Sequence, residues 1–257
     1  MQPYLKTAAM AAGAIGDSPL FLLDYALRLL RVIVLISLWR VILAGKDQSA
    51  MSLGAVLTYT LISEVFAHQL AVRTTITESF WEGTFVLRFL RPMGLVRQFA
   101  AEMSGLWLVH FALFSIPLLA LAPLLGVDPR PATPTNGVLF IVSLTLGILV
   151  GLALEVVFAA ITVAMEQPVW LVEYIRTAIG TLLSGSLLPL AYYPWGIGAV
   201  FSFLPFAAMA WAPLAIFTNA DDPTKLIGLQ VLWVVILWPL SLKLWSSNRE
   251  KLVGYGG

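Results

Sequence analysis

The stretch EGTFVLRFLRPMGLVRQFAAE, residues 82–102, places charged residues and a proline between two long apolar segments. On a helix, its first part divides into an apolar arc and a basic face: Phe85, Val86, Phe89 and Leu90 against Arg88 and Arg91. Pro92 and Gly94 end this helix, and a second helix begins toward Arg97. Such a short amphipathic helix either rests on anionic lipid through its arginines or docks its apolar face on a soluble partner.

The composition around this stretch is that of a membrane protein. Of the 257 residues, 60% are hydrophobic and 11% are charged, whereas soluble domains carry about 25% charged residues. Cysteine is absent, which excludes disulfides and thiolate metal sites. A net charge of +1 gives no reason to expect a nucleic-acid partner. We therefore expect the whole chain, 1–257, to form one transmembrane domain.

A membrane-spanning helix needs about 20 largely apolar residues. The sequence offers six candidates: 29–44, 51–72, 103–125, 138–165, 169–190 and 226–245. Six spans place both termini on one side, and only four of the fifteen Lys and Arg residues then lie on the other: Arg40, Lys46, Arg130 and Lys225. Because cytoplasmic loops are rich in Lys and Arg, both termini and residues 73–102 are predicted to be cytoplasmic. The predicted fold class is an all-α polytopic protein in the cell membrane.

The N-terminal segment 1–28 leads into the first span through a polar stripe. Asp24, Arg28 and Arg31 follow one another at helical spacing on an otherwise apolar helix. This pattern is typical of a helix that lies in the headgroup plane. It is equally compatible with the cytoplasmic end of a long first span, and the sequence leaves both alternatives open.

Residues 184–219 are apolar but interrupted by Pro189, Pro194, Pro205 and Pro213. A straight span facing lipid does not tolerate these breaks, because each freed backbone group needs a partner in hydrocarbon. We expect half-helices that enter from the outer face and return, shielded by other helices. A seventh, kinked span is the alternative, but it would leave the positively charged C-terminal tail outside.

Four ionisable residues lie within the candidate spans: Glu64 and His68 at i, i+4 on the second, His110 on the third and Glu155 on the fourth. Glu64, His110 and Glu155 lie roughly 13–20 Å from the cytoplasmic charges at 1.5 Å per residue. A charge at mid-bilayer costs about 3 kcal/mol, so such groups face the bundle interior or a wet cavity. They form either one polar cluster lining a pathway or separate residues, each bonded to a neighbouring helix.

Other patterns limit the chemistry. The sequence GILVG, residues 147–151, permits close approach of another helix. There is no G-x-x-x-x-G-K-[ST] nucleotide-binding loop and no H-E-x-x-H motif. We therefore expect no catalysis, metal or cofactor on this chain.

In their order and sidedness, these features resemble the membrane subunits of type-2 ATP-binding-cassette (ABC) exporters. The resemblance rests on six spans, on EGTFVLRFLRPMGL with its L-R-P element, and on the proline-rich LLSGSLLPLAYYPWGIGAVFSFLPFAAMAWAPLAIF before the last span. The resemblance covers nearly the whole chain. Within the family, the chain is similar to the six-span permeases without a large outer domain.

The resemblance implies a role for each part. Residues 82–94 would be a coupling helix that docks on a separate nucleotide-binding ATPase, which binds ATP and Mg, through Glu82, Phe85, Arg88, Phe89 and Arg91. A second permease subunit would complete the pathway. Residues 184–219 would cap its outer end, with a gate formed by Pro189, Tyr192, Tyr193, Pro205 and Phe206. The docking helix departs from the family pattern in having only Glu82 as an acidic residue near its start.

Two other functions remain open on the sequence alone. Glu64, His68, His110 and Glu155 are of the residue types that a proton-coupled secondary transporter uses. A membrane scaffold would instead use the loop at 82–94 only to recruit a protein.

Overall fold

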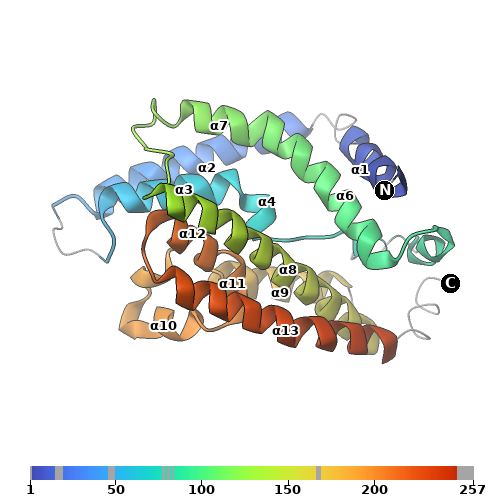
Figure 1. Ribbon diagram of the computed structural model, residues 1–257. Coiled ribbons are helices and arrows are strands. Elements are labelled where there is room, and N and C mark those ends of the chain that lie inside the picture. The colour runs from blue at the N-terminus through green and yellow to red at the C-terminus, as the bar shows by residue number, and fades with distance from the viewer. Residues whose placement is uncertain are drawn as a thin grey trace.

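The computed structural model describes residues 2–14, 20–45, 50–76, 79, 82, 84–165 and 169–247, and these ranges contain helices and no strand (Figure 1). The longer helices are α1 (Gln2–Ala14), α2 (Leu20–Ile42), α3 (Leu53–Val65), α6 (Leu95–His110), α8 (Pro134–Met165), α9 (Val169–Leu183) and α13 (Pro223–Ser247). The shorter elements are α4 (Ala67–Leu70), η2 (Phe85–Leu90), η3 (Phe111–Ser115), α7 (Ile116–Leu121), η4 (Leu190–Tyr192), η5 (Pro194–Gly196), α10 (Ile197–Phe201), α11 (Pro205–Met209) and α12 (Trp211–Thr218).

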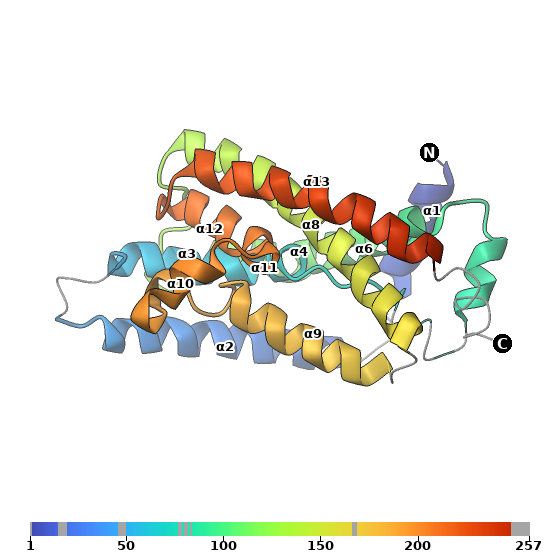
Figure 2. The same cartoon turned by 90° about the horizontal axis from the view of Figure 1, so that it is seen from below.

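Three helical stretches in the described part of the chain are long and apolar enough to cross a membrane: Leu95–Leu121, Pro134–Ala164 and Pro223–Ser247. They correspond to the predicted spans 103–125, 138–165 and 226–245. The first is built from α6, η3 and α7 without interruption. Figures 1 and 2 show α8 and α13 packed side by side along most of their length.

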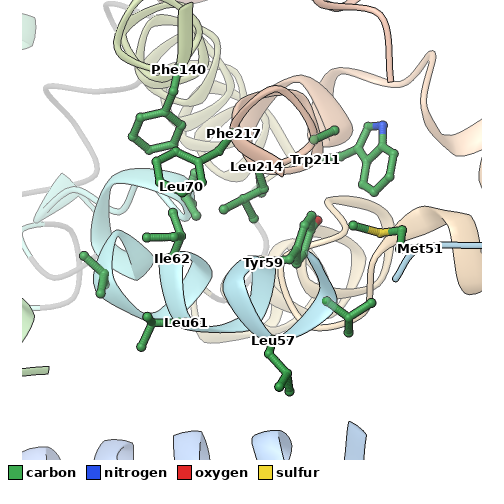
Figure 3. Close-up of a cluster of buried hydrophobic side chains, with 14 of the residues drawn as sticks. Met51, Leu57, Tyr59, Leu61, Ile62, Leu70, Phe140, Trp211, Leu214 and Phe217 are labelled. Carbon is green, nitrogen blue, oxygen red and sulfur yellow. The ribbon is translucent and has the colours of Figure 1, made fainter. Parts of the chain in front are cut away.

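The main core forms around α12, which lies between α3 and α8 (Figure 3). Leu214 on α12 has no solvent-exposed surface, and the ring of Tyr59 lies 5.9 Å from that of Trp211. The proline-interrupted stretch thus folds into the short elements η4, η5, α10, α11 and α12, of which α12 is enclosed by longer helices. This arrangement agrees with the predicted half-helices, since the neighbouring helices shield the freed backbone.

Small and polar residues fix α8 against its neighbours. The Gln230 side chain on α13 donates to the carbonyl oxygens of Ser143 and Ala208 and accepts from the Ser143 hydroxyl. A Cβ at Gly147 would lie 3.0 Å from the Met209 carbonyl oxygen, so α11 reaches α8 only because Gly147 has no side chain. The close helix approach that GILVG predicts is therefore confirmed.

The prediction of one continuous helix over 51–72 is wrong. The backbone leaves helical geometry at Phe66 (φ −106°, ψ 20°), resumes for the four residues of α4, and is irregular after Leu70. At the break, the Ser115 hydroxyl of η3 donates to the Val65 carbonyl oxygen at 2.6 Å, and after α4 the Glu155 carboxylate of α8 accepts from the Thr74 N–H at 3.1 Å. Side chains inside the bundle thus replace missing helical partners.

Helix α1 packs directly on α6, near the end of the molecule that also holds the end of α13 (Figure 1). The Tyr4 hydroxyl donates to the Ala100 carbonyl oxygen at 3.2 Å. A Cβ at Gly105 would lie 2.0 Å from the Ala8 carbonyl oxygen, so the two helix backbones touch there. The helix expected in segment 1–28 was the one around Asp24 and Arg28, so α1 is an additional element.

The contact between α1 and α6 depends on Gly105. We predict that Gly105→Val lowers the midpoint of thermal unfolding in detergent by several degrees, because overpacking of about 1–3 kcal/mol must push α1 away. Gly228→Val on α13 is the matched control, since nothing lies within 4 Å of a Cβ there. Equal shifts for the two variants would contradict the tight contact.

Candidate functional site: two charged clusters and a short exposed helix

The polar stripe of α2 faces α3 and α4. Arg28 pairs with Asp24 at 2.8 Å and donates to Nε2 of His68 at 2.8 Å. One turn further, Arg31 pairs with Glu64 on α3. Because α2 is continuous from Leu20 to Ile42, the stripe belongs to the same helix as the predicted first span, as the second alternative requires.

His68 also contacts His110, with ring centroids 4.1 Å apart. A guanidinium can only donate, so Nε2 of His68 accepts the bond from Arg28. Nδ1 of His110 lies 2.9 Å from the Leu106 carbonyl oxygen, and the π-helix η3 begins at the next residue. Such π-helical insertions often occur at functional sites.

Glu155 lies in a second cluster, which joins α8 to α9 and to the irregular segment after α4. It forms an ion pair with Arg176 and accepts from the Thr74 hydroxyl at 2.8 Å. Arg176 also pairs with Glu173 at 3.0 Å, and Glu173 lies 3.9 Å from Arg73. The Glu155 and Arg176 side chains are both buried, so each charge depends on the other.

The four ionisable residues are therefore not brought into one cluster. His68 and His110 meet, and Glu64 joins them through the neighbouring arginines of α2. Glu155 lies apart, in the second cluster. The helix break at Phe66 also removes the i, i+4 relation expected for Glu64 and His68, although both still face α2. No group of three or more acidic or histidine residues in the described ranges could hold a metal ion.

The helix in the opening stretch is η2, a 3-10 helix and not the expected α-helix. With three residues per turn, side chains at i and i+3 share a face. Phe85, Arg88 and Arg91 consequently form the inward face, and Leu87 and Leu90 form the outer face. The predicted apolar arc of Phe85, Val86, Phe89 and Leu90 is divided between faces because it assumed 3.6 residues per turn.

Arg88 holds η2 against the rest of the protein. Its guanidinium donates to Glu102 at 2.7 Å, to Ser79 at 2.9 Å and to Thr75 at 3.1 Å. It also lies over the Phe99 ring, 4.5 Å from the centroid. Arg88 therefore joins η2 to α6 and to the segment that follows α4.

The expected docking residues lie in different environments. Phe85 is fully buried, and Arg91 bonds to Glu102 at 3.2 Å. Glu82 is exposed, and Phe89 is partly exposed. Among the described side chains of η2, the most exposed are Leu90 (81%), which belongs to the predicted apolar arc, and Leu87 (60%), which the sequence analysis did not select.

A groove of about 710 Å³ lies beside η2. Its lining combines apolar, basic and small residues: Arg88, Phe89, Arg91, Met93, Gly94, Leu95, Val96, Arg97, Trp245 and Ser246. The groove and η2 lie at the same end of the molecule as α1 (Figure 1).

The expected gate residues lie on the short elements η4 and α11 and on the segments next to them. Pro189 is buried, and the Tyr192 and Tyr193 hydroxyls donate to the carbonyl oxygens of Met51 and Leu182. Pro205 starts α11, and the Phe206 ring packs 6.5 Å from that of Phe158. These residues hold the segment 189–206 against the longer helices.

Sequence reasoning missed Glu102 and Arg176, which complete the two buried ion pairs. Arg176 was counted only among the cytoplasmic charges, although it lies well inside α9, whose other residues are mostly apolar. An ionisable residue in such a helix was the available signal. Glu102 had none, because its partner Arg88 lies beyond a helix break.

One family model, described as ABC-2 family transporter protein, matches residues 26–256. No curated protein matches the chain, and no solved structure does.

The Glu155–Arg176 pair yields a stability prediction. Glu155→Gln removes the buried partner of the Arg176 guanidinium, which then pairs with the more exposed Glu173 alone, and should destabilise the protein by about 3 kcal/mol, seen as a lower unfolding midpoint in detergent. Arg176→Gln should have a similar effect, and the double variant should be less destabilised than the sum of the two. Additive effects would contradict a direct pair.

Proposed function

The chain belongs to the ABC-2 transporter family, and on this premise we propose that it is the permease subunit of an exporter driven by a separate ATPase. The family assigns it a role as a transmembrane transport permease. We further propose that it forms the pathway with a second permease subunit. ATP and Mg would bind to the partner ATPase, and this chain would carry out no chemistry itself.

The observation that carries the proposal is the outer face of η2. Leu87 and Leu90 project from a helix that Arg88 fixes in place, beside a groove with Arg91 and Arg97 on its lining. Large exposed apolar side chains within a polar rim are typical of protein contact sites. A partner that offers an apolar pocket with acidic residues around it would complement this surface.

The attachment of η2 suits a coupling role. Arg88 bonds to Glu102 on α6 and to Thr75, which directly follows the residue that Glu155 holds. A force on η2 would therefore act on α6 and on the segment 71–76 through short, buried contacts. Rigid contacts of this kind are the physical requirement for coupling between sites.

We propose that six helical units span the membrane: α2, α3 with α4, α6 to α7, α8, α9 and α13. In Figure 1, the C-terminal end of α2, which carries Arg40, and the loop between α7 and α8, which carries Arg130, lie opposite η2, and Arg40 donates to the Leu125 carbonyl oxygen of that loop. This placement supports an orientation with η2, α1 and the end of α13 on the cytoplasmic side.

The buried carboxylates favour this proposal over proton-coupled transport. Glu64 and Glu155 each form an ion pair with an arginine, and Glu155 also holds backbone. These contacts support a helix-packing role for both carboxylates.

The proposed docking face of Leu87 and Leu90 can be tested by introducing charged residues. We predict that the double variant Leu87→Glu, Leu90→Glu lowers the amount of P-loop ATPase retained by the tagged protein in mild detergent by about tenfold or more, because charged groups enter an apolar contact. The retained ATPase is quantified by mass spectrometry.

Leu124→Glu is the matched control, since Leu124 is equally exposed (83%) but lies at the opposite end of the molecule. It should retain the ATPase at the level of the unmodified chain. Undiminished retention by the Leu87, Leu90 variant would overturn the docking face. The absence of any ATPase under several extraction conditions would overturn the proposed function.

A further inference from the structure

A second groove, of about 470 Å³, lies between α2, α4 and α6. Its polar lining consists of Asp24, Arg28, Arg31, His68 and Arg73. The remaining lining residues are Leu27, Ala67, Ala71 and Trp107, so the groove is polar on one side and apolar on the other.

The lining of the groove carries more positive than negative charge, although each of its arginines also has a carboxylate partner. Three guanidinium groups and one carboxylate line it. The counter-ion of Arg31 is Glu64, which is buried behind it, and the counter-ion of Arg73 lies 3.9 Å away on α9. The Arg31 and Arg73 side chains nevertheless remain 51% and 57% exposed.

The donor atoms lead to the same conclusion. A guanidinium has five N–H donors. Among the described residues, Arg28 uses two nitrogens, toward Asp24 and His68, while Arg31 uses one toward Glu64. Arg73 bonds to the Thr177 hydroxyl at 3.2 Å. Most donors of the three arginines thus remain available to an acceptor inside the groove.

An apolar pocket adjoins the cationic groove. Ala71 and Arg73 line both spaces, and the pocket continues between α8, α9 and α11 along Leu154, Phe158 and Met209. Its volume of about 70 Å³ has room for the start of a hydrocarbon chain. The two spaces together match a molecule with an anionic head and an apolar tail.

We propose that the groove binds the phosphate or carboxylate head of an anionic amphiphile, which Arg28, Arg31 and Arg73 contact. A planar guanidinium pairs with both kinds of oxyanion through two parallel hydrogen bonds. As a cargo site, this assignment rests on the proposed function. As an anion site, it stands independently of any ATPase.

The test uses the full chain in phosphatidylcholine nanodiscs without ATPase, titrated with dodecyl phosphate in a calorimeter. Dodecyl maltoside, which is uncharged, and inorganic phosphate, which has no tail, are the comparison probes, and empty discs give the background. We expect dodecyl phosphate to bind at least about tenfold more tightly than either probe, and its affinity to fall with added salt.

Arg73→Gln is the informative variant, because Arg73 is exposed and its removal leaves no buried carboxylate unpaired. It should weaken binding of dodecyl phosphate about tenfold, the effect of losing one charged hydrogen-bonding group. Asp24→Asn should strengthen binding, since it removes the only carboxylate on the lining. Arg130→Gln, on the far side of the molecule, is the control and should change nothing.

The same titration in discs that contain phosphatidylglycerol identifies the source of the anion. Competition by this lipid identifies the ligand as a bilayer lipid, and lack of competition identifies a different amphiphile; both outcomes support the site. Equal affinity for inorganic phosphate would overturn the amphiphile assignment. No binding, or identical binding by Arg73→Gln, would overturn the anion site, while ATPase docking through η2 would be unaffected.

Discussion

The Glu155 carboxylate satisfies the constraint on which the bundle depends: a chain that leaves helical geometry among apolar helices must find other partners for its backbone. Glu155 accepts from the N–H and the hydroxyl of Thr74 and pairs with Arg176. One side chain on α8 thereby holds α9 and the end of the α3–α4 unit. In hydrocarbon, each of these groups would otherwise remain unsatisfied at a cost of several kcal/mol.

The segment 71–76 connects the features that a transport function requires. Its first residues line both the cationic groove and the adjoining apolar pocket. Thr74 is held by Glu155, and the next residue, Thr75, accepts from Arg88 of η2 and donates to Glu102. One short stretch of chain therefore contacts η2 and also lines the cationic groove. Because residues 72–74 lie outside any helix, this stretch can rearrange with fewer bonds broken than a helix would need.

Composition and periodicity predicted the class of protein and much of its architecture. Two features were predictable because they depend on local sequence alone. These are the long apolar helices α8 and α13, and the division of 184–219 into short elements by its prolines. The break at Phe66 was not predictable, since the Ser115 hydroxyl that donates to the Val65 carbonyl oxygen comes from a distant part of the chain. Pairings such as Arg88 with Glu102 likewise depend on tertiary contacts. The faces of η2 were assigned wrongly because the sequence of so short a helix does not distinguish a 3-10 helix from an α-helix.

The 3-10 geometry of η2 also determines which kinds of evolutionary change the segment can accept. With three residues per turn, every third residue belongs to the same face. Inserting one residue before Arg88 would bring a leucine opposite Glu102, whereas deleting one would bring an arginine to the outer face. The packing of η2 on α6 therefore depends on the length of this segment, whereas the proposed docking face depends on the identity of Leu87 and Leu90.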